Sequence, residues 1–193
     1  MTPSERFFDR RFVDQLRAYV PTGGAEAAHH QAMLELLAAA EDPFSRSHFQ
    51  PGHFTASCYI IDGDGRLLLH HHRRLGRWLP MGGHIEPGEA PLLAASREGA
   101  EESGLEHDLM IDDAILDLDI HRIPAGRGEP EHDHYDVRYL AWTSTPGAIR
   151  IDRAESNDLA WVTLDRAAGL MGGPESLRVI RKIEHLIRER SPS

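Results

Sequence analysis

The stretch from Gly82 to Leu105 constrains the fold of this chain more than any other. It reads GGHIEPGEAPLLAASREGAEESGL. Proline in the first turn and glycine just past the last turn mark the two ends of many helices, and Pro91 and Gly104 bracket a run of good helix formers here. The stretch therefore predicts a glycine-containing loop followed by a helix that ends at Gly104.

Three glutamates lie on one face of this helix, because Glu98, Glu101 and Glu102 are spaced i, i+3 and i+4. Carboxylates this close repel one another unless something pairs with them. The residues alone leave two interpretations open. The face is either a solvated acidic surface, with Arg97 paired to Glu101, or a site for a hard cation such as Mg²⁺, which prefers oxygen ligands.

The spacing resembles the Nudix box, and the GGHIE sequence is similar to a bacterial subgroup of that family. Gly99 departs from the pattern, since it stands where the box has an aliphatic residue. A glycine inside a helix costs about 1 kcal/mol relative to alanine, so we expect Gly99 to let the helix pack tightly against a bulky neighbour. The positions that match the box are Gly83, Glu89, Arg97, Glu98, Glu101, Glu102, Gly104 and Leu105.

The resemblance implies an α/β (α+β) fold, an α/β/α sandwich in which helices cover both faces of a mixed β-sheet. It also implies hydrolysis of a diphosphate bond in a nucleoside diphosphate derivative, by metal-activated attack of water at phosphorus. Mg²⁺ is the expected cofactor, with Mn²⁺ as a substitute, because cations that bridge phosphate oxygens neutralise the charge that protects the bond. The partner is a small-molecule diphosphate, and dimers are common in the family, which leaves room for a homodimer.

By the same resemblance, Glu98, Glu101, Glu102 and Arg97 are the expected catalytic residues. Glu101 and Glu102 would ligate Mg²⁺ together with the carbonyl of Gly82. Glu98 would ligate a second ion, or orient and deprotonate the water. Arg97 would hold the carboxylates in place. The expected metal ligands are therefore Gly82, Glu98, Glu101 and Glu102.

Five residues are expected on the substrate side of the site. Gly83 would allow the backbone to approach the metal and phosphates, and Glu89 would tie the loop to Arg97. In the stretch 132–140 one strand face carries every second residue. Its polar members could bind a transition metal, form a hydrogen-bonded strand beside His121, or face the substrate. They are His132, His134, Asp136 and Arg138, of which the last three complete the substrate-side set.

Two further stretches can each be interpreted either as part of the functional site or as ordinary protein surface. The basic loop Arg73–Arg77 is either a solvated surface or an electrostatic guide for phosphates. Glu155 and Asp158 precede a tryptophan-bearing strand, as in the family stretch from which some members draw an extra carboxylate; a surface turn is the plain alternative.

We expect two parts in the chain of 193 residues: an N-terminal helical extension over residues 1–50, packed on the core, and a Nudix domain over residues 51–193. The extension reads as a helical hairpin. Ser4, Phe8, Phe12, Leu16 and Tyr19 outline its first helix, and Ala25–Ala40, burying Met33, Leu34, Leu37 and Ala40, outlines its second.

The remaining pattern alternates strands with turns. Expected strands cover residues 53–61, 66–72, 109–121, 132–140, 149–151 and 155–162, with a hairpin turn at 62–65. In 109–121, Leu116, Leu118 and Ile120 should share one face, opposite Asp117, Asp119 and His121. A short helix is expected from Asp165 and a last helix from Pro174.

Composition narrows the function. A net charge of −10 argues against a nucleic-acid-binding surface, and the sequence has neither an apolar run that could span a bilayer nor a secretory leader, so we expect a cytoplasmic protein. The single cysteine, Cys58, lies in the apolar stretch SCYII and is expected to be a buried thiol. Two alternatives to hydrolysis stay open: a non-catalytic ligand-binding module, and an isopentenyl-diphosphate isomerase, which would need a cysteine in a suitable loop.

Overall fold

The computed structural model describes residues 10–126 and 128–190, so Ser4 and Phe8 of the expected first helix lie outside the described residues. Among these, no helix has the length and apolar character needed to cross a membrane. The elements run in the order α1 (Arg10–Ala18), α2 (Gly24–Ala39), β1 (Gly52–Ile61), β2 (Leu67–His72), β3 (Arg77–Leu79), β4 (Met81–His84), α3 (Pro91–Ser103), β5 (Met110–Ile123), β6 (His132–Trp142), a 3-10 turn (Pro146–Ala148), β7 (Ser156–Val162), α4 (Leu164–Met171) and α5 (Pro174–Arg190).

Seven strands of the described chain form one mixed sheet. Its central path is β3-β2-β1-β6-β5, while β4 pairs with β1 and β7 pairs with β2. β1 and β6 run parallel, and the other pairs are antiparallel. The expected turn between β1 and β2 is confirmed, since one carboxylate oxygen of Asp62 accepts from the backbone N–H groups of Asp64 and Arg66.

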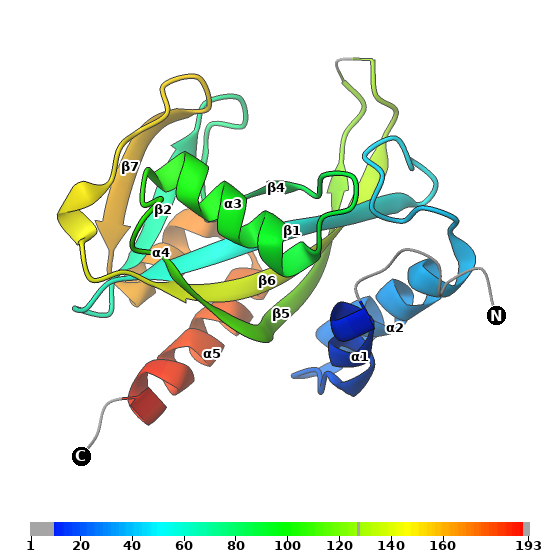
Figure 1. The fold of residues 1–193 in the computed structure, drawn as a ribbon, viewed down its shortest axis with the longest axis horizontal. Helices are drawn as coiled ribbons and strands as arrows, with labels where there is room; N and C mark the ends of the chain where they lie inside the picture. Colours follow the sequence, from blue (N-terminus) through cyan, green and yellow to red (C-terminus); the bar gives the residue numbers. More distant parts are fainter. Residues whose placement is uncertain (1–9, 127, 191–193) are drawn as a thin grey trace.

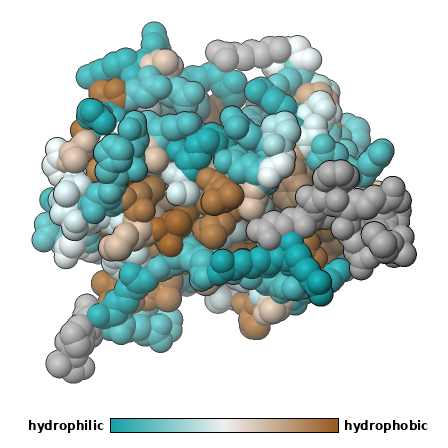
Figure 2. Space-filling view, in the orientation of Figure 1, coloured by the Kyte–Doolittle hydropathy of each residue, from teal (hydrophilic) through white to brown (hydrophobic). Residues whose placement is uncertain are grey.

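The sheet lies between two layers of helices, which confirms the α/β/α expectation. Figure 1 shows α3 lying across β1 and β4, whereas α4 and α5 lie on the other side and α1 and α2 sit beside β5. Alternate residues of β1 face the two layers: Phe54 and Cys58 pack in the cluster with α3 and the N-terminal helices, and Tyr59 and Ile61 pack with α5. Figure 2 shows hydrophobic residues near the middle of one face, with hydrophilic residues around them.

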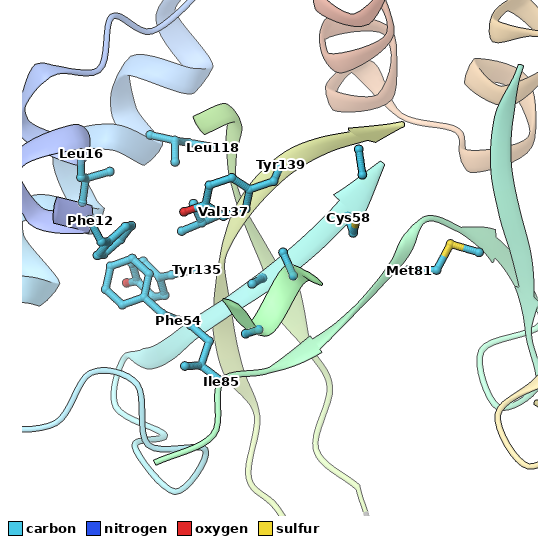
Figure 3. Close-up of a cluster of buried hydrophobic side chains, with 14 of the residues drawn as sticks. Phe12, Leu16, Phe54, Cys58, Met81, Ile85, Leu118, Tyr135, Val137 and Tyr139 are labelled. Carbon is cyan, nitrogen blue, oxygen red and sulfur yellow. The ribbon is translucent and has the colours of Figure 1, made fainter. Parts of the chain in front are cut away.

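The expected helical hairpin is present and packs on the sheet. Figure 3 shows Phe12 and Leu16 of α1 directed toward a cluster that includes Phe54 of β1 and Tyr135 of β6. The rings of Phe12 and Phe54 meet edge to face, with centroids 5.7 Å apart. The N-terminal helices therefore complete the larger core cluster.

The buried face of α2 differs in part from the expectation. Met33 and Leu37 are buried as expected, but Leu36 is buried as well, while Leu34 and Ala40 are only partly buried. The helix has apolar residues on nearly every side, so spacing does not single out one face.

The expected alternation along β5 is wrong at Leu116. This residue packs in the cluster with α5, whereas Leu118 and Ile120 pack in the cluster with the N-terminal helices. The register against β6 shifts between Ile115 and Asp117. A bulge of this kind inserts an extra residue and reverses the parity of the residues after it, so a strict period of two fails across it.

The expected strand at residues 149–151 is also wrong, because this segment has no regular structure. Instead it lies against the end of α3, where the Arg150 N–H donates to the Ser103 carbonyl at 2.8 Å. Gly104 permits this approach. It takes φ = 74°, and a Cβ there would lie 2.8 Å from Cβ of Arg150.

Candidate functional site

A pocket of about 1450 Å³ lies where the box, β1, β6 and the loop before β3 come together. The loop and helix of the box supply polar groups to the wall of this pocket, and β6 supplies others. Among the residues predicted from sequence, the wall contains Gly82, Gly83, Glu89, Arg97, Glu98, Glu102, His134, Asp136 and Arg138.

Arg97 holds the box together. Its guanidinium donates to both carboxylate oxygens of Glu89 at 3.0 Å, to Glu98 at 2.9 Å and to the carbonyl of His84 at 3.0 Å. These bonds, led by the one to Glu89, raise the pKa of Arg97. The loop, the helix and the end of β4 are thus tied to one permanently charged group.

Glu102 points into the protein and is only 5% exposed. Its carboxylate accepts a hydrogen bond of 2.8 Å from the backbone N–H of Gly82. Burial raises the pKa of this carboxyl to about 9, with further contributions from Glu155 and Glu98. The Glu102 carboxyl is therefore held at the pocket wall, where its ionised form is unfavourable without a cation beside it.

Glu98 lies against the glycine pair at the start of the box. A Cβ on Gly83 would come within 2.5 Å of its carboxylate oxygen, and one on Gly82 within 2.7 Å of the Ala56 carbonyl. Only glycine fits at either position without a shift of the surroundings. Burial also raises the pKa of Glu98.

Glu101 is placed differently from its two neighbours. Its side chain is 60% exposed, its carboxylate lies 3.3 Å from Arg97, and it is not part of the pocket wall. Glu155 is one of two candidates for an extra carboxylate at the site. In the structure it lines the pocket and contributes to the raised pKa of Glu102. Asp158 is exposed and accepts from the Leu159 N–H.

The carboxyl groups of Glu98, Glu102 and Glu155 suit a hard divalent cation. All three line one pocket, all their donors are oxygens, and two of them have pKa values raised by burial. A Mg²⁺ ion would offset the repulsion between them, and the close approach allowed by Gly82 would expose a carbonyl as a further oxygen ligand. The residues present thus fit the cofactor that the sequence implied.

Asp136 and Arg138 of β6 line the pocket but are already paired with other groups. Arg138 is buried and pairs with Asp136 at 3.0 Å, Asp117 at 3.1 Å and Asp119 at 2.9 Å. Asp136 also accepts from the hydroxyl of Ser57 at 2.9 Å. The carboxylates around Arg138 raise its pKa despite its burial. The side chains of Asp136 and Arg138 are therefore fixed by their partners, which neutralise most of the charge that a substrate could bind.

The basic loop forms another part of the wall. Arg73 donates to the Arg153 carbonyl, and Arg77 donates to the Met171 carbonyl. Arg74 also lines the pocket, and its side chain has no hydrogen bond or ion pair with the described residues. It lies near enough to His72 and His84 to lower the pKa of both rings, after the larger effect of burial.

Cys58 is buried, as expected, and lies behind the site. It is fully enclosed in β1, and burial raises the pKa of its thiol. A Cβ on Gly99 would lie 2.8 Å from its sulfur. Gly99, the one position that departs from the box pattern, is thus the point at which α3 packs closely on β1. The thiol is not part of the pocket wall.

Comparisons with known proteins match this arrangement to one family. The NUDIX domain family matches residues 51–183. An isopentenyl-diphosphate Delta-isomerase of Streptomyces griseus subsp. griseus is 35% identical over 168 residues, covering 75% of this chain and 81% of that protein. Alignments with two further Streptomyces isomerases span only 61% and 50% of those proteins. A Mycobacterium tuberculosis protein provisionally named 8-oxo-dGTP diphosphatase 2 is 36% identical over 102 residues, covering 47% of this chain and 64% of that protein.

Solved structures show the same fold. The Caenorhabditis elegans Ap4A hydrolase in a binary complex superposes with a TM-score of 0.59 at 22% identity, covering 70% of this chain and 98% of that one. The extent of the family match, the box and the mixed sheet between helices agree with one another. The chain therefore belongs to the Nudix family.

Proposed function

We propose that this protein hydrolyses the diphosphate bond of a nucleoside diphosphate derivative with the help of Mg²⁺. One observation carries the proposal. Glu98 and Glu102 are drawn into a large pocket beside Gly82 and Gly83, and Arg97 fixes the position of Glu98. Buried carboxyl groups with raised pKa values gain most from a bound cation, and a bound cation is what an acidic protein needs to accept a diphosphate.

Each group of this wall has a distinct task. Glu98, Glu102, Glu155 and the Gly82 carbonyl would hold the ion, which when bound would neutralise phosphate charge and acidify water. Glu98 also orients and deprotonates the attacking water. Arg97 keeps the carboxylates in place and does not contact the substrate. Glu101, at the outer end of the face, would contribute only as an oxygen ligand to a second ion.

The pocket has room for a nucleotide derivative. At about 1450 Å³ it exceeds the roughly 300–1000 Å³ typical of sites for drug-sized ligands. Arg74 attracts the anionic substrate, because its charge faces the pocket and is not paired with another side chain of the described residues. The ion and Arg74 would thus make the pocket locally attractive to anions in a protein whose net charge is −10.

The test is a panel of diphosphates assayed with Mg²⁺, with products identified. Exchanging even outer partners of metal ligands costs about 10–100-fold, so Glu98→Gln and Glu102→Gln should each lower kcat/KM by about 100-fold or more. Glu106→Gln, an exposed acidic position just past the box, is the matched control and should keep full activity. Normal turnover in both box variants would refute the assigned roles.

A second candidate function is isomerisation of isopentenyl diphosphate, which the names of the Streptomyces relatives favour. Its substrate is also a diphosphate, but the reaction moves protons on carbon instead of breaking the diphosphate bond. That chemistry would need a cysteine in a suitable loop, and the single cysteine of this chain is buried in β1. Including isopentenyl diphosphate in the panel separates the cases: a double-bond isomer supports isomerisation, and absence of turnover with every compound supports a binding module.

A further inference from the structure

Three histidines form a compact group outside the box. A ring nitrogen of each of His53, His132 and His134 lies within 4.8 Å of the others. β1 and β6 run parallel, which places His53 opposite His134, and His132 is two residues earlier on the same face of β6. Figure 1 shows the two strands side by side in the middle of the sheet. The group is therefore built on two rigid strands.

Two ring nitrogens of this group are buried without partners. His53 is 0% exposed and His132 is 2% exposed. Within the described part of the chain, Nε2 of His53 and Nε2 of His134 find no hydrogen-bond partner. A buried polar atom left unpaired costs about 1–3 kcal/mol, so two of them facing the same small space indicate that something binds there.

Backbone carbonyls set the tautomers of two of the rings. Nδ1 of His132 lies 2.8 Å from the Pro130 carbonyl, and Nδ1 of His53 lies 3.3 Å from the His48 carbonyl. A carbonyl oxygen only accepts, so each Nδ1 carries the proton and each Nε2 keeps a lone pair. Histidines that bind metals are oriented in this way, with one nitrogen donating to a carbonyl and the other facing the ion.

We propose that His53, His132 and His134 bind one divalent transition-metal ion, of the zinc type, at a site separate from the carboxylates of the box. Imidazole nitrogens suit Zn²⁺, Fe²⁺ or Ni²⁺, whereas Mg²⁺ prefers oxygen. Three histidines with one open position is also a known ligand set for zinc at reactive sites. The histidine group and the carboxylates of the box would thus select ions of different chemistry.

The geometry allows this with small movements. Metal–nitrogen distances of about 2.0–2.1 Å place tetrahedral ligand atoms roughly 3.4 Å apart, so the nitrogens must close by about 1.5 Å at most. His134 lines the pocket, and His84, whose ring centroid is 5.2 Å from that of His134, lines it too. The open position of the ion therefore faces the pocket, where water or a phosphate oxygen of the substrate can fill it.

The test measures Co²⁺ binding to protein freed of metal by a chelator, in excess Mg²⁺ so that the box is saturated. We expect one equivalent of Co²⁺, with the visible absorption of a nitrogen-ligated ion, and its displacement by Zn²⁺. His132→Gln and His134→Gln should each weaken binding by about tenfold or more. His121→Gln is the matched control, because its ring centroid is only 5.5 Å from that of His134 but its nitrogens lie outside the group.

Wild-type protein gives a second readout that does not depend on the folding of any variant. Adding Zn²⁺ in excess Mg²⁺ should shift the Nε2 resonances of His53, His132 and His134 in nitrogen-15 spectra, and leave those of His107 in place. Absence of Co²⁺ uptake, or unchanged ring resonances in Zn²⁺, would overturn the proposal. Because both readouts measure binding, they stand or fall independently of Mg²⁺-dependent hydrolysis at the box.

Discussion

Gly99 shows how a single missing side chain sets the packing of the box helix. The sequence predicts close packing at this position but does not identify the neighbour, because Cys58 is far away in the chain. In the structure a Cβ at Gly99 would lie 2.8 Å from the sulfur of Cys58 and 3.1 Å from a methyl of Leu109. The helix accepts a poor helix former so that α3 can approach β1.

Replacing Gly99 by alanine should therefore destabilise the protein. Overpacking costs about 1–3 kcal/mol, and better helix propensity returns about 1 kcal/mol, so the net loss should be roughly 0–2 kcal/mol. Cys58→Ala alone should also destabilise, by leaving a small cavity. The double variant Gly99→Ala/Cys58→Ala should lose less free energy of unfolding than the two single variants lose in sum. Urea denaturation measures all three, and strictly additive losses would contradict the contact.

The raised pKa of Glu102 predicts that Mg²⁺ binding releases a proton. With a pKa of about 9, the carboxyl is protonated at pH 7 without the ion, but only the carboxylate can ligate Mg²⁺. Calorimetry in two buffers of different ionisation enthalpy should show release of up to about one proton per ion. Affinity should rise with pH up to about 9. Glu102→Gln should abolish the release, and a release that persists in this variant would assign the proton to another group.

The same shift makes the ion-free protein less stable at higher pH. The folded state keeps the proton of Glu102 up to about pH 9, whereas the unfolded chain loses it near the ordinary value of 4.5. Between these values the folded state binds more protons, so this carboxyl contributes stability at low pH that is lost as the pH rises.

Helix geometry explains why one box glutamate differs from the other two. At about 100° per residue, Glu98 and Glu102 lie about 40° apart around the helix, and Glu101 lies about 60° to the other side of Glu98. The sequence spacing correctly placed all three glutamates on one face of the helix. It did not identify which of them faces the pocket. That choice depends on where β4 lies, since the Gly82 N–H binds Glu102.

At the scale of elements, the N-terminal helices are joined to the rest by a buried charge that the sequence did not indicate. Glu26 of α2 is fully buried, and it accepts from the Leu118 N–H of β5 at 3.1 Å and from Lys182 of α5 at 2.5 Å. Lys182 also lies 2.7 Å from Asp117. Residues this far apart in sequence carry no shared local pattern, so only the fold brings them together.

Removing Glu26 should be costly, because Lys182 and the Leu118 N–H would lose a buried partner. Breaking a buried ion pair from one side costs about 3–5 kcal/mol, so Glu26→Ala should reduce the free energy of unfolding by about that amount. Glu26→Ala/Lys182→Met should cost less than the two single changes together. Glu129→Ala, which breaks the exposed pair with Arg46, is the control and should cost about 0–1 kcal/mol. Denaturation curves of the four variants decide this.

Element boundaries were predictable where local chemistry sets them, and less so where partners do. Pro91 and Gly104 bracket α3 as their chemistry requires, and the Asp62–Gly65 turn joins β1 to β2. The bulge in β5 and the irregular path at residues 149–151 arise from contacts with β6 and with the end of α3. Neither contact leaves a signal in the local sequence.

At the scale of the whole molecule, the family match and the folding unit differ in extent. The match begins at residue 51, yet the larger core cluster reaches into both N-terminal helices. The division into residues 1–50 and 51–193 follows the start of the family match, whereas the core cluster has members on both sides of it. We propose that residues 51–193 on their own lack part of the hydrophobic core.

A chain of residues 51–193 should accordingly fail to form a stable domain. The truncation removes five buried side chains and exposes the surface that they cover. These side chains are Phe12, Leu16, Met33, Leu36 and Leu37. At about 1.5–3 kcal/mol each, these contribute roughly 8–15 kcal/mol, which is comparable to the about 5–15 kcal/mol by which domains are stable. We expect loss of the cooperative thermal transition and binding of a hydrophobic dye. Adding a peptide of residues 10–40 should restore the transition in part, whereas a truncated chain that melts like the full one would show that the helices merely rest on a finished core.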